Sequence, residues 1–240
     1  MALRGCRYDK GLFEISYDIL NPDRERSILF LHGWGSEREI MKQAFSSTLD
    51  SYRHIYIDMP GFGKSPNDIF LETKEYASIV KLFLDEIGIQ ADIVVGHSFG
   101  GKVATLLNPK CLVLLSSSGI KVPKTFGVKA RIAIYKTLKK MGLGALRRYF
   151  TSEDARDMND AMYETFKYVV NEDFEPNFEK VDGKALLFWG KSDTATPLWT
   201  SEKIMARIPG ISKLHTFEGG HYFFLQHARE IASIIEKECP

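Results

Sequence analysis

The stretch Gly96-His97-Ser98-Phe99-Gly100 decides the fold of this chain. It follows the apolar run of residues 91–95 and precedes a helix-like run over residues 101–107. A serine between a strand and a helix, with a glycine on either side, is typical of a nucleophile elbow. The glycines permit this sharp turn because a β-carbon at either position would collide with the neighbouring strand or helix. Ser98 is therefore the candidate nucleophile.

An acid and then a histidine follow Ser98 along the chain. This is the chain order of the catalytic residues in proteins that use a nucleophile elbow. Asp193 lies in Gly190-Lys191-Ser192-Asp193, and His221 lies in Gly219-Gly220-His221-Tyr222. Neutral imidazole can take the proton of a serine hydroxyl near neutral pH, which predicts His221 as the general base. Asp193 would accept a hydrogen bond from the other ring nitrogen. The simpler interpretations, a surface histidine and a helix-capping carboxylate, lose weight when both residues occur in this order.

A glycine-bounded loop, His32-Gly33-Trp34-Gly35, follows the apolar strand of residues 27–31. Acyl transfer needs hydrogen-bond donors aimed at the developing oxyanion. The predicted donors are the backbone N–H groups of Trp34 and Phe99. His32 and Phe62 are the candidates for the wall of the substrate pocket, although for His32 we favour bracing of the loop by hydrogen bonds.

The chain resembles the α/β-hydrolase superfamily over nearly its whole length. Five motifs in order carry the resemblance, and they are residues 32–35, residues 58–65, the elbow at Ser98, the Asp193 loop and the His221 loop. The resemblance implies an α/β fold with a mostly parallel, twisted sheet of about eight strands flanked by helices. It also implies a core domain of residues 1–119 and 182–240, and a helical cap, residues 120–181, inserted after the sixth strand. The chain looks most like small bacterial serine hydrolases related to ring-cleavage-product hydrolases.

Periodicity in the remaining sequence agrees with alternating strands and helices. A hairpin is predicted at residues 9–11. Further strands are expected at residues 28–31, 54–57, 93–96, 112–116, 185–189 and 213–217, and helices at residues 37–47, 73–87, 99–107, 200–207 and 228–238. The candidate residues then follow the carboxyl ends of strands, where open parallel sheets bind ligands.

Composition excludes several classes of function. The 240 residues carry a net charge of +1, which gives no general attraction for nucleic acid. No glycine-rich dinucleotide or Walker pattern is present, so no cofactor is expected. The expected partner is a small-molecule acyl substrate, and the oligomeric state is not predicted.

The three cysteines, Cys6, Cys111 and Cys239, are odd in number and widely spaced. Their spacing indicates neither a disulfide framework nor a zinc site, and no other metal site is expected. The first residues lack the apolar core of a signal peptide, and no run is long enough to span a membrane. These observations predict a cytoplasmic protein.

The expected cap is polarised in charge. Residues 121–150 hold nine basic side chains and no acidic one, whereas residues 151–180 are rich in Asp and Glu. Val128, Ile132, Tyr135 and Leu138 recur at helical spacing, which favours an amphipathic cap helix with a solvated cationic face. Contact with a lipid surface and recognition of an acidic substrate group are the alternatives.

The principal functional hypothesis is a serine hydrolase that cleaves a small carboxylic ester or thioester through an acyl-enzyme on Ser98. A serine at the elbow argues against the dehalogenase and epoxide-hydrolase branches, which use aspartate there. The nearest alternative is carbon–carbon bond hydrolysis of a ring-cleavage product of the 2-hydroxy-6-oxo-dienoate type, although the oxyanion loop differs from the run typical of those enzymes. A ligand-binding protein without turnover on the same fold is the second alternative.

Overall fold

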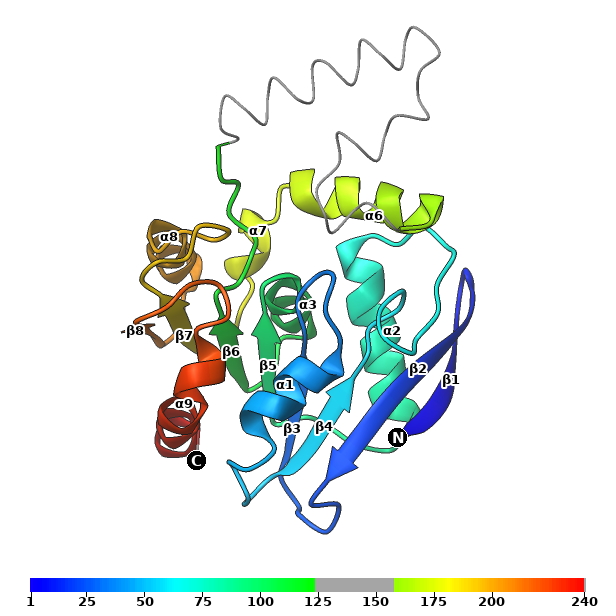
Figure 1. Ribbon diagram of the computed structural model, residues 1–240, viewed down its shortest axis with the longest axis horizontal. Helices are drawn as coiled ribbons and strands as arrows, with labels where there is room; N and C mark the ends of the chain where they lie inside the picture. Colours follow the sequence, from blue (N-terminus) through cyan, green and yellow to red (C-terminus); the bar gives the residue numbers. More distant parts are fainter. Residues whose placement is uncertain (124–157, 240) are drawn as a thin grey trace, which may run out of the picture.

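The structure is a computed structural model that describes residues 1–123 and 158–239. Its strands form one eight-stranded sheet in the order β1-β2-β4-β3-β5-β6-β7-β8 (Figure 1). β2 runs antiparallel to both β1 and β4, and every other neighbouring pair is parallel, which confirms the predicted mostly parallel sheet. The strands are β1 Ala2–Tyr8, β2 Gly11–Leu20, β3 Ser27–Leu31, β4 Arg53–Ile57, β5 Ile93–His97, β6 Cys111–Leu115, β7 Lys184–Gly190 and β8 Ser212–Phe217.

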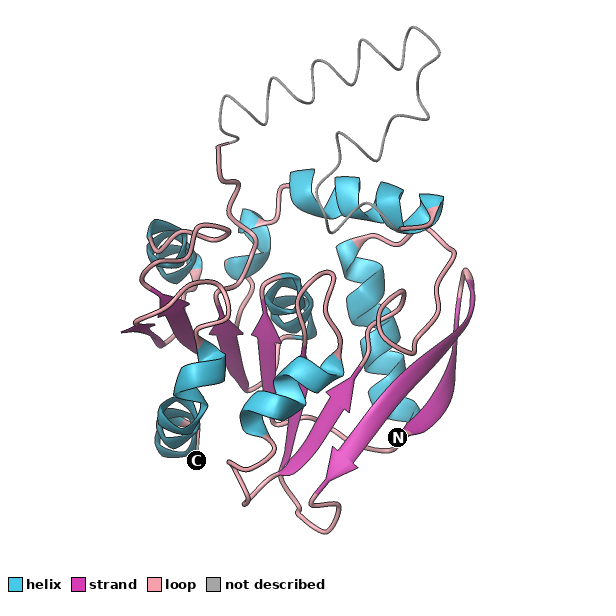
Figure 2. Ribbon diagram, viewed as in Figure 1, coloured by secondary structure: helices cyan, strands magenta, loops and turns pink. Residues whose placement is uncertain are grey.

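Helices cover both faces of the sheet (Figure 2). α1 and α9 pack on one face, and α2, α3 and α8 pack on the other. The described helices are α1 Arg38–Phe45, α2 Thr73–Glu86, α3 Phe99–Leu107, α6 Asp160–Asn171, α7 Glu175–Phe178, α8 Trp199–Arg207 and α9 Phe224–Glu238. The five helices predicted at residues 37–47, 73–87, 99–107, 200–207 and 228–238 are present, and α9 begins four residues before its predicted start at Ala228.

The central strand β3 shows why these elements form. All five of its residues are buried, and successive side chains point to opposite faces of the sheet. Leu29 and Leu31 enter the core under α2 and α3, whereas Ile28 and Phe30 enter the core under α1 and α9. A strand that is buried on both faces reads as a continuous apolar run, and this made β3 recognisable in the sequence.

The connection between β6 and β7 holds the segment expected to form the cap. Its described part contains α6 and α7, and Figure 1 shows α6 beyond the carboxyl ends of the parallel strands. The apolar positions proposed for the basic cap helix, Val128, Ile132, Tyr135 and Leu138, lie outside the described residues. Among the helices that the structure describes, none has the length and apolar character needed to cross a membrane.

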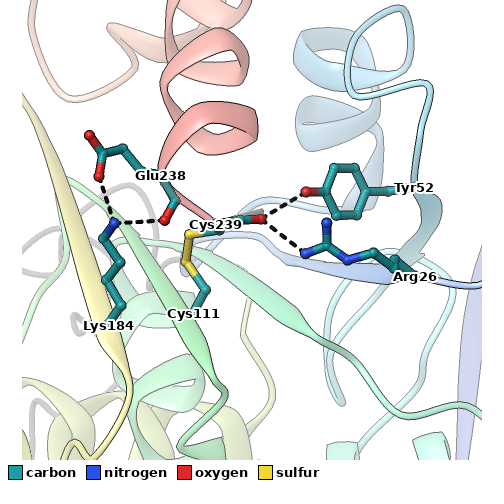
Figure 3. Close-up of a disulfide and its surroundings, with 6 residues drawn as sticks. All are labelled: Arg26, Tyr52, Cys111, Lys184, Glu238 and Cys239. Atoms are coloured by element: carbon teal, nitrogen blue, oxygen red, sulfur yellow. Dashed lines mark hydrogen bonds and ion pairs between the residues drawn. A yellow bond between two sulfur atoms is a disulfide. The ribbon is translucent and has the colours of Figure 1, made fainter.

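The cysteines depart from expectation. Cys111, at the start of β6, and Cys239, just after α9, form a disulfide with their Cα atoms 6.1 Å apart, whereas Cys6 is buried and free (Figure 3). No local pattern indicates this bond, because the two cysteines lie 128 positions apart and only the folded sheet brings them together. Disulfides persist mainly in oxidising compartments, so the bond removes one premise of the predicted cytoplasmic location.

Polar contacts hold the same end of the chain in place (Figure 3). The Cys239 carbonyl accepts hydrogen bonds from the Arg26 guanidinium and the Tyr52 hydroxyl, each at 2.9 Å. Lys184 Nζ lies 2.6 Å from both the carbonyl and a carboxylate oxygen of Glu238. The C-terminal end of α9 is therefore anchored to the sheet through the backbone as well as through sulfur.

Candidate active site

Ser98 stands on the turn between β5 and α3, with φ 51° and ψ −113°. A non-glycine residue with positive φ is uncommon, and such strain is concentrated at functional sites. The flanking glycines allow the turn because of close backbone contacts. A β-carbon on Gly96 would meet the Gly100 backbone, and one on Gly100 would meet the carbonyl oxygens of Leu31 and His32. The structure thus has a strained strand-to-helix turn at Ser98 with a closely packed glycine on either side.

Asp193 follows β7 and is held as a charged hydrogen-bond acceptor. Its Oδ1 accepts the backbone N–H groups of Ala195 at 2.8 Å and Thr196 at 2.9 Å. Its Oδ2 lies 2.8 Å from His221 Nδ1 and 2.9 Å from the Thr196 hydroxyl. Burial alone would raise the pKa of this carboxyl, but the bonds from His221 and Thr196 outweigh it and lower the pKa to about 2.

His221 follows β8 and reaches Asp193 from the neighbouring loop. Because a carboxylate can only accept, Nδ1 carries the proton in this pair, and Nε2 is the ring nitrogen left for other partners. The His221 side chain is 19% exposed, whereas that of Asp193 is fully buried. The Ser98 hydroxyl makes no hydrogen bond within the described residues. His97, beside Ser98, has its ring centroid 4.6 Å from that of His221.

The loop after β3 packs directly on the elbow. A β-carbon on Gly33 would lie 3.2 Å from Ser98 Cβ and 2.8 Å from His97 Nδ1. The next N–H in the chain belongs to Trp34, and the N–H of Phe99 is the first of α3, which has no acceptor within its helix. Neither N–H has an acceptor in the described part of the chain. Two backbone donors are therefore free beside the candidate nucleophile.

His32 holds the loop of residues 32–35 in place through hydrogen bonds of its ring. It is fully buried, its Nδ1 donates to the Gly33 carbonyl at 2.8 Å, and its Nε2 accepts the Met59 N–H at 3.1 Å. Burial lowers the pKa of His32 to about 4, so the ring is neutral. Its contacts are those of a bracing residue, and its assignment to the pocket wall remains a prediction.

The loop of residues 58–65 is held by a buried carboxylate. Asp58 accepts the backbone N–H groups of Arg38 at 2.8 Å and Lys64 at 2.9 Å, and it forms an ion pair with the Arg38 guanidinium. Arg38 begins α1, three residues after the loop of residues 32–35. These bonds fix the two loops to one another.

Aromatic rings surround the Trp34 side chain. Phe62 lies 4.9 Å away and Phe99 lies 5.2 Å away between ring centroids, both edge to face, and Phe166 on α6 lies 5.4 Å away. Trp34 Nε1 is buried and has no acceptor within the described residues. The site therefore has an apolar wall beside the free backbone donors, with one unused N–H in it.

The sequence analysis missed several residues that support the site. Thr196 binds Asp193 and also lies 3.1 Å from the Ser116 carbonyl. Lys102 on α3 is buried, and its Nζ lies 2.7 Å from Glu172 at the end of α6. The motif Asp-x-x-Thr is a weak local signal for Thr196. Nothing local to the sequence pairs Lys102 with a carboxylate 70 residues later.

Comparison of the sequence with known protein families identifies the family of this chain. The profile described as "Alpha/beta hydrolase family" matches residues 28–234, which include the elbow, the Asp193 loop and the His221 loop. The chain belongs to the alpha/beta hydrolase family. Within the described residues of this alpha/beta hydrolase, no group of three or more His, Cys, Asp and Glu side chains is placed to hold a metal ion.

Relatives of this alpha/beta hydrolase have different names. A 2-hydroxy-6-oxononadienedioate/2-hydroxy-6-oxononatrienedioate hydrolase of Klebsiella pneumoniae is 25% identical over 89% of this chain and 86% of its own length. A dihydrolipoyllysine-residue acetyltransferase component of the acetoin cleaving system of Cupriavidus necator is 34% identical over 42% of this chain, but the match covers only 27% of that relative.

Solved structures share the fold. An esterase from Exiguobacterium antarcticum superposes with a TM-score of 0.76 at 21% identity, covering 98% of both chains. At this identity the likeness concerns the architecture alone. The family and its relatives together identify the protein as a hydrolase with the fold that the sequence predicted.

Proposed function

We propose that this protein is a serine hydrolase that cleaves a small carboxylic ester or thioester through an acyl-enzyme on Ser98. The observation that supports this most is the 2.8 Å bond between His221 Nδ1 and Asp193 Oδ2, formed beside the strained elbow. This bond leaves His221 Nε2 as the basic nitrogen. The acid, the base and the elbow lie after three different strands, and the fold brings the acid and the base into contact.

In the proposed acylation, His221 Nε2 takes the Ser98 proton as Oγ attacks the substrate carbonyl. The buried Asp193 carboxylate stabilises the imidazolium that forms. The backbone N–H groups of Trp34 and Phe99 bind the oxyanion, and fixed donors of this kind are worth about 3 kcal/mol each in comparable sites. His221 then gives its proton to the leaving alcohol or thiol. Water attacks the acyl-enzyme by the same route in reverse.

The aromatic wall favours an apolar acyl group. Trp34, Phe62 and Phe166 present ring surface next to the proposed oxyanion donors. Apolar and aromatic surface with a few placed polar groups is the usual lining of a small-molecule pocket. Phe62 therefore keeps the pocket role predicted from the sequence.

The same proposal treats residues 120–181 as a cap and the remainder as the core domain. α6 brings Phe166 to Trp34, and its C-terminal end is tied to α3 by the buried Lys102–Glu172 ion pair. Lys102 lies four residues after Ser98, so this pair joins the cap to the helix that begins at the nucleophile. A cap held in this way would exclude water during acylation.

The direct test is labelling by a fluorophosphonate, which a nucleophilic serine attacks at phosphorus with loss of fluoride. We expect one adduct on the native protein by intact mass and none on Ser98→Ala. Ser78→Ala is the matched control because Ser78 lies on α2 and bonds only the Lys74 carbonyl. Labelling of Ser98→Ala at the native rate would refute the assignment. No labelling of the native protein would favour the ligand-binding alternative.

Carbon–carbon bond hydrolysis is the second candidate, and the Klebsiella pneumoniae relative supports it, since its name states hydrolysis of a substrate of the 2-hydroxy-6-oxo-dienoate type. The same three residues can serve both reactions. Turnover of p-nitrophenyl butyrate and of a 2-hydroxy-6-oxo-dienoate, each followed by absorbance, separates them. An ester rate that exceeds the dienoate rate by tenfold or more in kcat/KM would support the principal proposal, and the reverse order would replace it.

A further inference from the structure

His97 joins three parts of the site that are distant in sequence. It is the last residue of β5, stands next to Ser98 and is fully buried. Its Nε2 lies 3.0 Å from the backbone carbonyl oxygen of His221. Its Nδ1 faces Gly33 so closely that a β-carbon there would lie 2.8 Å away. The ring of Phe224, at the start of α9, lies 4.9 Å from it.

The hydrogen-bonding pattern fixes the state of this ring. A carbonyl can only accept, so Nε2 must carry the proton. Burial, and to a smaller extent the neighbouring His221, lower the pKa of His97 to about 3. The ring is therefore neutral, with a bare Nδ1 that has no partner among the described residues. A neutral ring adds no second positive charge beside the imidazolium that His221 becomes.

Packing alone does not account for an imidazole at this position. Tyr222 and Phe224 surround the ring, at 5.0 and 4.9 Å between centroids, so an apolar side chain would fill the space as well. A buried ring nitrogen without a partner is a cost that an apolar side chain would avoid. What the imidazole provides is one N–H directed at the backbone of the candidate base.

We propose that His97 is a positioning residue for the reaction proposed above, on which this inference rests. Its Nε2–H holds the main chain of His221 and so keeps the base loop in place relative to the strand that ends at Ser98. Gly33 contributes to the same alignment, because only a residue without a β-carbon lets the loop of residues 32–35 pack on the unprotonated Nδ1 of His97. One side chain thus aligns the nucleophile, the base and the oxyanion loop.

The test compares two substitutions of similar volume, His97→Gln and His97→Met. The Gln amide nitrogen stands near the place of Nε2 and can donate to the His221 carbonyl, whereas Met fills the space without a donor. We expect His97→Met to lower kcat for ester hydrolysis by about 10- to 100-fold with KM within about twofold, as small misplacement of a reacting group does. His97→Gln should recover most of this loss.

Two controls keep the outcome clear. Fluorophosphonate labelling of the native protein at Ser98 shows that the proposed reaction holds, independently of His97. Thermal unfolding checks that each variant folds, and His97→Asn, whose amide is too short to reach the carbonyl, replaces His97→Met if that variant does not. Equal kcat values in the donor and non-donor variants would overturn the positioning role, whether both values match that of the native protein or both are lower. The assignment of Ser98 would stay intact.

Discussion

Reduction of the Cys111–Cys239 disulfide is expected to destabilise the protein while leaving the active-site contacts in place. The bond closes a loop of 128 residues, from the start of β6 to the end of α9. In the chain-entropy treatment such a loop restricts the unfolded state by about 5 kcal/mol, and measured effects of disulfides are typically about 2–4 kcal/mol. For a domain of this size, each kcal/mol shifts Tm by about 2–4 °C. Reduction should therefore lower Tm by about 5–15 °C.

The native state should change little on reduction. The hydrogen bonds from Arg26 and Tyr52 to the Cys239 carbonyl do not involve sulfur, nor does the contact between Lys184 and Glu238 (Figure 3). α9 stays anchored through them, and its first turn continues to pack beside His97. Activity at 25 °C is thus expected to remain within about twofold, because the effect lies mainly in the unfolded chain.

The assay is thermal unfolding with and without a phosphine reductant. Cys111→Ala and Cys239→Ala should start at the lower Tm and show no response to the reductant. Cys6→Ala is the matched control, since it removes a buried free thiol and should keep the full response. Under denaturing conditions one thiol should react before reduction and three after it. Three reactive thiols before reduction, or an equal response in Cys111→Ala, would refute the reasoning.

Four further predictions concern the site. Asp193→Asn should lower kcat/KM for ester hydrolysis by about 10³- to 10⁴-fold by favouring the wrong tautomer of His221, and unchanged kinetics would move the acid elsewhere. Because the folded-state pKa of Asp193 is about 2, below its ordinary value of 3.8, its contribution of about 2 kcal/mol is present above pH 4 and lost as pH falls towards 2. The gap in urea-unfolding free energy between the native protein and Asp193→Asn should narrow over that range, and a constant gap would contradict the pKa. Lys102→Met should cost about 3 kcal/mol in urea unfolding by leaving Glu172 buried without its cation, and adding Glu172→Gln should recover part of the loss. Gly100→Ala should abolish fluorophosphonate labelling, since its β-carbon meets backbone that cannot move aside, and native labelling would show that the elbow is looser than described.

Most of the fold was predictable because each buried strand carries its own signal. β3 is apolar at every position after Ser27, and β5 is apolar over residues 93–95 and leads directly to Ser98 between its two glycines. The start of α9 was placed too late because residues 224–227 follow the His221 loop directly and include His227, whose backbone departs from helical geometry. Local patterns thus located the elements but not every boundary.

The residues that were missed act through partners far along the chain. Cys111 meets Cys239, Lys102 meets Glu172, and Phe166 meets Trp34 only after the sheet has formed and α6 has packed beside it. No spacing rule connects such pairs, because their distance in sequence carries no information on their distance in the fold. The residues of the proposed reaction could be predicted from sequence motifs. The residues that hold them in place could be recognised only in the structure.

Three histidines beside glycine illustrate the same division. His32, His97 and His221 all lie next to a glycine at the end of a strand or in the loop that follows it, so residue type and position do not distinguish them. Environment does. Burial lowers the pKa of His32 to about 4 and that of His97 to about 3, and each directs its single proton to a backbone carbonyl. His221 alone has a carboxylate on Nδ1 and a side chain open to solvent. These two differences separate the candidate base from the two buried rings that hold neighbouring loops in place.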